Sequence, residues 1–406
     1  MGGVSSIVIS ELEYAPPGAD QLFFDVSFGI APGEHAALVG ANGVGKSTIL
    51  KILTGEYECD GGDFTVNGSV LSMTQDVGMS RPTDTLREML IEVAPTHLRT
   101  AGRALVAAEK ALADGSDDGM GYATALGDWG DMGGYDLETK WQAAAQRSVK
   151  TTVDDFSRRL VSELSGGERK RLVLDLLLTS GADVLLLDEP FSAVDAPTRQ
   201  TLYRELAALR QKVSVPMVLV THDLAEARRL ADRVVIVDAG HTLQTGTPAR
   251  VFASPRNARV AELVGIQNHF EGRFYKDTPG WARLRWTPAG HGHEAIDLTV
   301  VDKNKIDDET PVTWVLNGEQ VDVLADGSTT HQPEKGATLL RCRLVEVLAL
   351  GEISLCTLTP EALTSQTITL NLTTRLLGRL DVKAGGWVQL LIAPGALHIM
   401  PVREVG

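Results

Sequence analysis

The chain has 406 residues, of which 43% are hydrophobic and 22% charged, and its formal net charge is −15. This length suits two or three domains, and the composition is typical of a folded globular protein and not of a disordered or fibrous one. The acidic balance argues against a general nucleic-acid binder, the apolar runs fall short of the about 20 residues of a membrane-spanning helix, and the N-terminus lacks the regions of a signal peptide, so we expect a cytoplasmic protein.

The first part of the chain alternates strand-like and helix-like segments. Residues 7–28 and 36–39 have strand patterns, and a helix is predicted from about Lys46, directly after a glycine-rich segment. Residues 84–113 have the apolar spacing of a helix, and the Gly- and Asp-rich stretch 114–134 is predicted to interrupt it. This order predicts a strand, a loop and a helix, followed by a helical region.

The alternation continues after residue 165 and predicts an α/β domain. A helix is expected to follow Ser165, and the continuous apolar run 184–187 is typical of a strand buried on both faces of a parallel sheet. The next predicted elements are a helix at 197–211, a strand at 217–220, a helix at 223–230 and a strand at 233–237. We therefore predict a mostly parallel sheet flanked by helices over residues 1–265, with a helical subdomain at about 80–165.

The chain changes character after about residue 270. Short β-rich runs, among them 312–316, 338–347 and 387–392, alternate there with Gly, Pro, Asp and Asn. Such runs with turn residues between them indicate a separate small β-barrel or sandwich over residues 270–406.

One glycine-rich segment carries the pattern of a phosphate loop. Residues 40–48 read Gly, four residues, Gly, Lys, Ser and Thr, between a predicted strand and a predicted helix. Glycines let backbone N–H groups converge on phosphates, the helix N-terminus adds its positive end, the lysine neutralises the β- and γ-phosphates and the serine ligates Mg²⁺. The predicted nucleotide-binding residues are Gly40, Asn42, Gly43, Gly45, Lys46, Ser47 and Thr48.

Two carboxylates follow the buried apolar run 184–187. Open α/β sheets bind ligands at the carboxyl ends of their strands, where Asp188 and Glu189 are predicted to lie. Asp188 is predicted to hold Mg²⁺, and Glu189 is predicted to polarise the attacking water as general base. The pair indicates phosphoryl hydrolysis because a phosphate loop precedes it.

The segment Leu164-Ser165-Gly166-Gly167-Glu168 decides between nucleotide hydrolase classes. A serine and glycines at a helix N-terminus suit an anion. The segment resembles the signature of ATP-binding cassette (ABC) proteins, a P-loop NTPase family. The resemblance implies that Ser165, Gly166 and Gly167 contact the γ-phosphate of an ATP held by a partner subunit, so that the chain works as a nucleotide-sandwich homodimer.

Four further positions match the ABC family and take their roles from that resemblance. Gln75 corresponds to the glutamine that contacts Mg²⁺ and water, Asp195 to the loop that crosses the dimer interface, and His222 to the histidine at the γ-phosphate. Tyr14 corresponds to the aromatic residue that stacks on adenine, although a tyrosine in a core strand explains it as well. The implied ligands are ATP and Mg²⁺.

Within the ABC family the chain resembles two subfamilies. From residue 182 onward, including 188–199 and Gly246-Thr247-Pro248, it is similar to importer ATPase subunits of the molybdate or sulfate type, and segments 370–379 and 394–401 resemble their small TOBE/MOP-like β domain. Residues of about 30–180, above all 127–135 and 167–175, are similar to ABC-F proteins, the soluble subfamily that acts on ribosomes. The change predicts a junction between residues 180 and 190, of natural or engineered origin.

The two resemblances imply different partners. As an importer ATPase the chain would bind integral-membrane permease subunits, lie on the inner face of the cell membrane and have a C-terminal domain that binds an oxyanion. As an ABC-F protein it would bind the ribosome, but such proteins carry two cassettes, and this chain has one phosphate loop. The importer is the first hypothesis, the ribosomal factor the second, and a cassette uncoupled from any partner the third.

Overall fold

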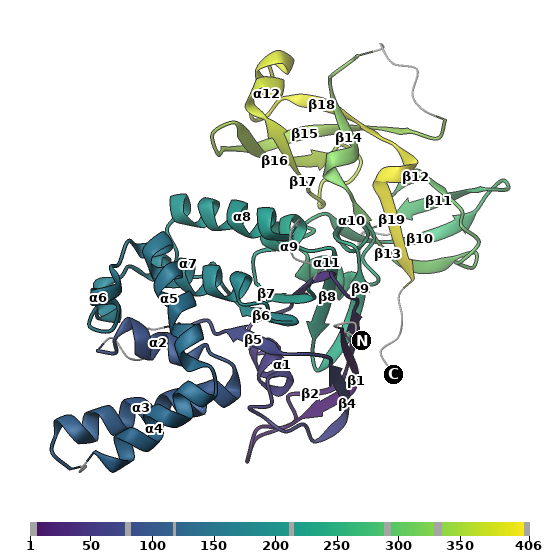
Figure 1. Cartoon of the computed structure of the whole chain (residues 1–406). Helices are drawn as coiled ribbons and strands as arrows, with labels where there is room; N and C mark the ends of the chain where they lie inside the picture. The colour runs from purple at the N-terminus through teal and green to yellow at the C-terminus, as the bar shows by residue number, and fades with distance from the viewer. Residues whose placement is uncertain are drawn as a thin grey trace. The chain divides into compact units, whose positions relative to one another are not determined.

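A computed structural model describes residues 6–77, 83–116, 119–210, 215–287, 294–328 and 335–401. The chain divides into two compact units, residues 1–248 and 249–406. Each unit has its own sheets (Figure 1).

The described part of the first unit contains a nine-stranded mixed sheet in the order β4-β1-β2-β9-β8-β3-β7-β6-β5. The strands are β1 (Ile7–Tyr14), β2 (Phe23–Ile30), β3 (His35–Val39), β4 (Gly61–Val66), β5 (Val70–Met73), β6 (Val184–Asp188), β7 (Met217–Val220), β8 (Arg233–Asp238) and β9 (His241–Gly246). The central strands β8, β3, β7, β6 and β5 run parallel, whereas β1 pairs antiparallel with β2 and β4.

The parallel centre follows from the apolar runs of the sequence. All five residues of β3 and all five of β6 are buried, as expected for strands covered on both faces. β7 lies between them, with Ala36 of β3 opposite Val218 and Leu186 of β6 opposite the same residue. This register brings the carboxyl ends of β3, β6 and β7 to one edge of the sheet, which is the edge at which ligands bind in such folds.

Helices of the first unit cover the sheet and form a helical subdomain. They are α1 (Lys46–Leu53), α2 (Leu86–Glu92), α3 (Thr96–Ala113), α4 (Met120–Asp131), α5 (Gly134–Val149), α6 (Val153–Phe156), α7 (Gly166–Thr179), α8 (Ala196–Arg210) and α9 (Leu224–Leu230). Figure 1 shows α3 and α4 side by side in the arm that projects from the sheet. The predicted elements from residue 184 to 238 match β6, α8, α9, β7 and β8 within a residue or two.

The interruption predicted for residues 114–134 is wrong over most of its length. Helix α4 occupies Met120–Asp131, in spite of the glycines within it. Its buried face carries Ala125 and Trp129, and Trp129 is fully buried and lies 6.2 Å from the ring of Trp141. Burial of one large aromatic side chain contributes more free energy than a few helical glycines cost, so packing overrides local propensity.

The helical region predicted at 84–113 consists of two helices. Pro95 is the N-cap of α3, and a residue before proline disfavours helical backbone angles, so the chain turns after α2. Helix α2 begins at a capping box in which Thr85 and Glu88 bond each other's backbone N–H.

The second unit is built mainly of antiparallel sheet. Its described residues form two five-stranded sheets, β12-β11-β10-β13-β19 and β14-β18-β15-β16-β17. The strands are β10 (His269–Lys276), β11 (Trp281–Trp286), β12 (Ile296–Val301), β13 (Thr310–Leu316), β14 (Val321–Ala325), β15 (Thr338–Ala349), β16 (Ile353–Pro360), β17 (Ile368–Thr373), β18 (Trp387–Ile392) and β19 (Leu397–Pro401). The helices are α10 (Pro248–Ala253), α11 (Ala258–Leu263) and α12 (Thr374–Leu380), of which α10 begins at the last residue of the first unit.

One apolar core joins the two sheets of the second unit. It contains the ring cluster Phe270, Trp286 and Trp314, with centroids 4.5 to 5.1 Å apart, and side chains from the other sheet such as Leu358 and Leu390. The two antiparallel sheets with a common core fit the predicted small barrel-like domain. In the described residues of both units, we find no helix with the length and apolar character needed to cross a bilayer.

Candidate functional site

The phosphate-loop segment joins β3 to α1 as predicted. Gly40 directly follows β3, where a Cβ atom would lie 2.1 Å from the carbonyl oxygen of Val237, so only glycine fits. Gly45, the N-cap of α1, has φ 92°, in the left-handed region that favours glycine, and a Cβ there would meet the ring of Phe23 at 2.8 Å. The glycines of the pattern are thus required by close backbone approach and by turn geometry.

Lys46 is buried at the start of α1. Its ammonium group donates to the carbonyl oxygens of Gly40, at 3.0 Å, and Ala41, at 2.8 Å, so the side chain curls back over the loop. Burial lowers the pKa of Lys46, and the negative charges of Glu189 and Asp188 oppose that shift. The arrangement places a partly desolvated cation inside the loop, where an anionic ligand would be held strongly.

Asp188 ends β6 next to the phosphate loop. Burial raises the pKa of this carboxyl group, and a hydrogen bond from Ser47 acts in the opposite direction. Its Oδ1 atom is buried and has no hydrogen-bond partner among the described residues. A buried oxygen of this kind is costly unless a ligand satisfies it.

Glu189 is the next residue after Asp188, and its backbone lies in the left-handed region, with φ 43°. Its carboxylate accepts a hydrogen bond from Nε2 of Gln75 at 3.1 Å, and its other oxygen lies 3.2 Å from Nδ1 of His222. The side chain of Glu189 is 14% exposed, whereas that of His222 is 61% exposed. The three predicted catalytic residues therefore meet at one carboxylate, although they come from three different loops.

A cavity of about 450 Å³ lies over the phosphate loop. It is lined by Leu22, Asn42, Gly43, Gly45, Lys46, Ser47, Thr48, Gln75, Glu189 and His222. A second cavity of about 250 Å³ shares Ser47 and Gln75 with it and reaches Asp188. Residues predicted from three separate motifs are thus brought together around one space.

Tyr14 does not line the cavity over the phosphate loop. Its side chain is buried, and its ring stacks on that of Tyr57, with centroids 5.7 Å apart and planes 7° apart, and contacts the ring of Phe23. It is absent from the residues that line the 450 Å³ cavity, where Leu22 is present instead. This placement favours the core tyrosine interpretation over the adenine platform, and the role of Tyr14 in binding adenine stays a prediction.

The signature segment forms the N-terminus of α7, away from the phosphate-loop cavity. Ser165 is the N-cap and accepts a hydrogen bond from the backbone of Glu168, while the Glu168 carboxylate accepts from the Ser165 backbone at 2.9 Å. The backbone N–H and the hydroxyl of Ser165, which both donate to the Glu168 carboxylate, hold the pKa of Glu168 below its usual range. Neither Ser165 nor Gly166 lines the cavity over the phosphate loop within the same chain.

Asp195 lies beside the signature segment. Its carboxylate is exposed and accepts from the backbone N–H of Thr198 at 3.1 Å. Hydrogen bonds from the Thr198 side chain and then from its backbone lower the pKa of Asp195. A Cβ atom on Gly167 would meet the Thr198 side chain at 2.9 Å, so the start of α7 and the start of α8 are closely packed. Ser165, Gly166, Gly167 and Asp195 therefore form a second group, separate from the first.

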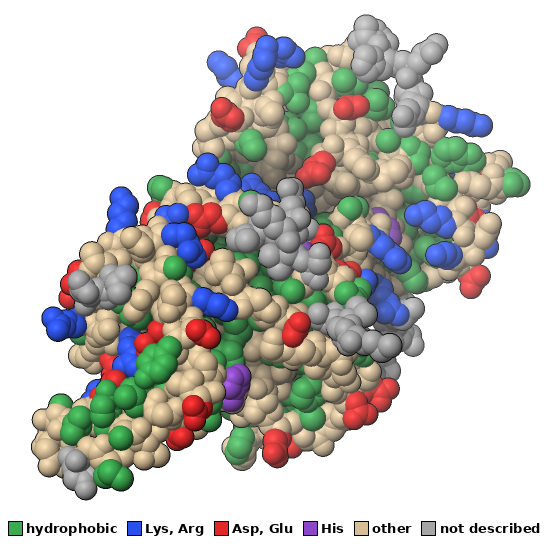
Figure 2. All heavy atoms as spheres, in the orientation of Figure 1, with side chains coloured by type: hydrophobic (Ala, Val, Ile, Leu, Met, Phe, Trp, Pro, Cys, Tyr) green, Lys and Arg blue, Asp and Glu red, His purple; other side chains and the backbone are tan. Residues whose placement is uncertain are grey.

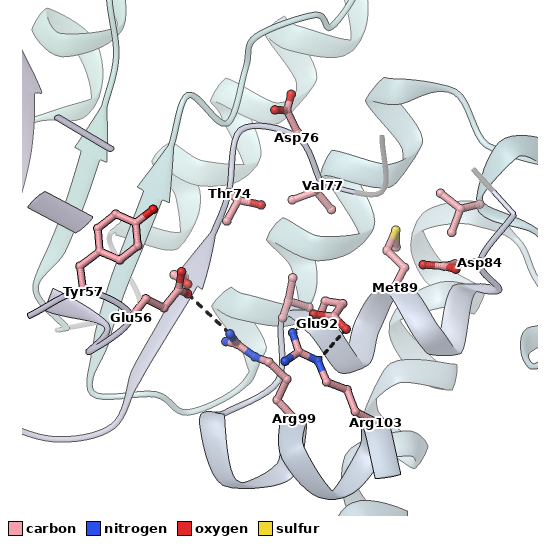
Figure 3. Close-up of a pocket in the computed structure, with 13 residues that line it drawn as sticks. Glu56, Tyr57, Thr74, Asp76, Val77, Asp84, Met89, Glu92, Arg99 and Arg103 are labelled. Carbon is pink, nitrogen blue, oxygen red and sulfur yellow. Dashed lines mark hydrogen bonds and ion pairs between the residues drawn. The ribbon is translucent and has the colours of Figure 1, made fainter. Parts of the chain in front are cut away.

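A groove that no sequence motif indicates lies between the sheet and the helical subdomain. Its volume is about 530 Å³, and Figure 3 shows side chains pointing into it from the end of β5, from α2 and from α3. Arg99 lies 3.6 Å from Glu56, and Nε of Arg103 donates to Glu92 at 3.0 Å. The groove lacks a sequence motif, because its residues are scattered from Glu56 to Val161.

A comparison with protein-family models matches residues 23–192 to the ABC transporter family. Residues 23–192 belong to an ABC transporter ATPase domain. This assignment agrees with the phosphate loop, the carboxylates after β6 and the capped start of α7, all of which lie within or at the end of the matched segment. An ABC ATPase domain implies binding and hydrolysis of ATP.

Curated relatives fall into two kinds. An "Antibiotic resistance protein" of Mycobacteroides abscessus is 35% identical over 64% of this chain and 48% of its own length. A sulfate/thiosulfate import ATP-binding protein of Bacillus cereus is 30% identical over 64% of this chain and 66% of its own length. An Fe(3+) ions import ATP-binding protein of Rhodococcus jostii is 28% identical over 77% of this chain and 78% of its own length.

The chain therefore spans about half the length of the first relative and slightly less than two thirds of the second. Relatives named as importer subunits differ in their cargo, since a polyamine import protein of Fusobacterium nucleatum, 29% identical, also matches. The predicted junction between residues 180 and 190 and the ABC-F likeness are not tested by these matches and stay predictions.

Proposed function

We propose that the chain is the ATP-hydrolysing subunit of an importer for an oxyanion such as molybdate or sulfate, and that it works as a homodimer with two ATP molecules in its interface. The observation that carries this proposal is the convergence of Lys46, Ser47, Glu189 and His222 on one cavity at the carboxyl edge of the sheet. The importer part draws support from the relatives named as import ATP-binding proteins.

The proposed hydrolysis depends on positioning and on charge. Lys46 neutralises the β- and γ-phosphates as they enter the loop, and the backbone N–H groups at the start of α1 face the same charge. Glu189 accepts a proton from the attacking water, since its carboxylate is held by Gln75 on one side and faces His222 on the other. His222 then contacts the γ-phosphate from the exposed side of the cavity.

The residues predicted to hold Mg²⁺ fit a hard cation with oxygen ligands. Asp188 has a buried oxygen without a partner among the described residues, and Ser47, which hydrogen-bonds this carboxylate, adds a hydroxyl oxygen. Gln75 lines the same two cavities. We propose that Asp188, Ser47 and Gln75 hold Mg²⁺, whose charge would neutralise the phosphate oxygens of bound ATP.

Dimerisation is proposed because the second group of predicted residues lies outside the lining of the phosphate-loop cavity in its own chain. Ser165 is exposed at the N-terminus of α7 and lies outside the cavity lining. An exposed helix N-terminus with its positive end free to face a γ-phosphate suits an anion that a second copy of the chain presents. Asp195, exposed beside it, would lie in the same interface.

We propose that the groove of Figure 3 receives a segment of a membrane permease subunit. The groove is bordered by residues 74–77, which follow β5 and include Gln75, and by α2 and α3 of the helical subdomain. A segment seated there would touch the strand end that carries Gln75, and Gln75 contacts Glu189. Docking and hydrolysis would then be coupled through one side chain, and the protein would lie on the inner face of the cell membrane.

The C-terminal unit is the proposed site of the transported oxyanion. Its two antiparallel sheets and its resemblance to the TOBE/MOP-like domain support this role. The named relatives transport sulfate, ferric ions or polyamines, so molybdate or sulfate is the choice that rests on the resemblance of the tail. Calorimetric titration of the full chain with molybdate and with sulfate tests it, and heats equal to those of a chloride control would contradict it.

The importer role is tested by copurification. The tagged chain should copurify with an integral-membrane protein from detergent-solubilised membranes, and that partner, reconstituted in liposomes, should stimulate its ATPase activity. A pool that is free of membrane protein and cosediments with ribosomes when ATP is added to a Glu189→Gln variant would contradict it and support the ribosomal hypothesis. Basal ATPase activity without any partner response would favour the uncoupled cassette.

A matched pair of arginines tests the groove itself. Arg103 on α3 is 57% exposed and paired with Glu92, and Arg147 on α5 is 54% exposed and paired with Asp175 at 3.0 Å. Arg103→Glu should abolish stimulation by the partner and leave basal ATPase activity unchanged, because it reverses a charge in the groove and spares the phosphate loop. Arg147→Glu should keep the stimulation, and equal loss in both variants would contradict docking in this groove.

A further inference from the structure

Lys170 is a buried lysine that neither the sequence motifs nor the proposed chemistry uses. It lies in α7, shortly after the signature segment, and only 4% of it is exposed. Lysines are rarely buried to this degree without a specific partner. Burial lowers the pKa of Lys170 to about 8, so keeping it charged here has a cost that something must offset.

The partners of Lys170 all belong to the loop that follows Glu189. Its Nζ donates to the carbonyl oxygen of Glu189 at 3.0 Å, to the carbonyl oxygen of Ser192 at 2.6 Å and to the hydroxyl of Ser192 at 2.8 Å. An ammonium group has three donors, and these bonds use all three. The Ser192 hydroxyl in turn donates to the Glu189 carbonyl at 2.9 Å. Lys170 and Ser192 thus both donate to the backbone of Glu189, the residue proposed as general base.

The backbone held by Lys170 has an unfavourable conformation. Glu189 has φ 43° and Ala193 has φ 55°, and both are non-glycine residues in the left-handed region. Such residues persist where the surrounding structure holds them, and they cluster at functional sites. The carbonyl groups bound by Lys170 belong to Glu189 itself and to the residue directly before Ala193, so the lysine holds this stretch from both ends.

The direction of the Glu189 side chain depends on that backbone. From the left-handed conformation in which the structure places Glu189, its carboxylate reaches both Gln75 and His222. The negative charges that act on the Lys170 ammonium group through space are, largest first, those of Glu189, Asp76, Asp188 and Glu226. They favour its charged form, whereas the hydrogen bonds to the loop fix its position.

We propose that Lys170 is a positioning residue for ATP hydrolysis, which ties α7 to the loop 189–193 and thereby holds the Glu189 carboxylate at the attacking water. This inference rests on the proposed role of Glu189 as general base. Because Lys170 belongs to the helix that begins with the signature segment, it also links the surface that faces a second copy to the carboxylate of its own chain. The lysine acts through Glu189 and does not touch ATP.

The test uses Lys170→Met, which keeps the length of the side chain and removes its donors. We expect kcat to fall at least about tenfold, because small misplacements of a catalytic group have large effects, while the dissociation constant for ATP changes less than about threefold. A residue that only supports folding would change binding and stability as well. An unchanged kcat, or a binding loss as large as the loss in kcat, would overturn the proposal.

A double variant separates this link from a general effect. In a Glu189→Gln background, Lys170→Met should not lower the single-turnover rate further, because the group it positions is already absent. A second drop by the same factor would show that Lys170 acts elsewhere. If Glu189→Gln alone hydrolyses ATP at the wild-type rate, both the role of Glu189 and this inference are overturned, whereas a slow Glu189→Gln with a fast Lys170→Met overturns the inference alone.

Should Lys170→Met fail to fold, Ser192→Ala gives the same test on a smaller scale. It removes one acceptor of Lys170 and the hydroxyl that donates to Glu189. We expect kcat to fall about threefold with ATP binding unchanged, since two of the three bonds of Lys170 remain. A wild-type kcat in Ser192→Ala would contradict the network.

Discussion

The proposed ATP site requires two groups of residues, the phosphate-loop group and the signature group. They differ in whether the residues of one chain surround a common cavity. In the phosphate-loop group, Lys46 and Asp188 are buried, and Ser47, Gln75, Glu189 and His222 surround one cavity. In the signature group, Ser165 and Asp195 are exposed, and each is hydrogen-bonded to the first turn of the helix that it begins or precedes. One chain thus brings together the residues of the first group, whereas under the proposed function the start of α7 would meet the γ-phosphate of ATP bound to a second copy.

The surface of the molecule is mixed in character. Figure 2 shows acidic and basic side chains scattered over the face in view, with hydrophobic side chains gathered over the arm where Figure 1 places α3 and α4. Exposed apolar residues of that arm include Leu112 at 41% and Met120 at 71%. Charged and apolar side chains therefore share the face in view.

The largest expected effect belongs to the phosphate-loop group. Lys46→Ala should weaken ATP binding about 1,000-fold, because removing one partner of a buried charge contact costs about 4 kcal/mol. Equilibrium binding of a fluorescent ATP analogue measures it. Lys140→Ala, which removes an exposed lysine of α5, is the control and should bind like the wild type. Wild-type affinity in Lys46→Ala would contradict the assignment of the loop.

Glu189→Gln should slow hydrolysis by at least about 100-fold and leave ATP binding intact. The amide cannot accept the proton of the attacking water, and general bases contribute factors of this order. Phosphate release under saturating ATP measures the rate. Glu163→Gln changes an exposed carboxylate that pairs with Arg159 and serves as control. If both variants hydrolyse equally fast, Glu189 is not the base.

Ser165→Ala probes the signature group and should have a smaller effect. We expect hydrolysis to fall about tenfold while ATP binding to the monomer is unchanged, because the serine belongs to the half of the site that a second copy completes. Losing an N-cap of this kind also costs about 1 kcal/mol of helix stability. Steady-state ATPase assays at several protein concentrations measure the loss.

Thr85→Ala supplies the matched control for that prediction. Thr85 and Glu88 form the same kind of capping box at α2, so the loss of helix stability is similar and the anion site is spared. Hydrolysis should stay at the wild-type level in Thr85→Ala. An equal decrease in both variants would mean that Ser165 matters only as a cap.

The last prediction concerns the pH dependence of stability and not activity. The pKa of Lys170 is lowered by burial from 10.5 to about 8, so between pH 8 and pH 10.5 the unfolded chain binds more protons at this residue than the folded one. Stability must then rise with pH in that window, relative to Lys170→Met. Denaturant unfolding at several pH values measures the difference, with Lys140→Met as control. A flat or falling difference would contradict a buried, titrating Lys170.

Much of the phosphate-loop group could be predicted from the sequence because its residues belong to short motifs of contiguous residues. Residues 40–48 fix both the glycines and the lysine, and the apolar run 184–187 places Asp188 and Glu189 at a strand end. The parallel alternation likewise predicts which strand ends meet. Periodicity and motif spacing carry this information without knowledge of tertiary contacts.

The remaining features depend on contacts between distant residues. Helix α4 forms in a glycine-rich stretch because Trp129 is buried there, and Tyr14 is covered by Tyr57. Lys170 looks like an ordinary charged helix residue until its partners at 189 and 192 are seen. No local pattern encodes such partners, so the sequence alone could not indicate them.

The central claim is that two copies complete the site around ATP. Size-exclusion chromatography of Glu189→Gln with and without saturating ATP and Mg²⁺ tests it most directly, because this variant binds ATP and does not hydrolyse it. We predict a monomer without ATP and a dimer with it, and the dimer should be lost in Glu189→Gln that also carries Ser165→Ala. A monomer at saturating ATP would contradict the account.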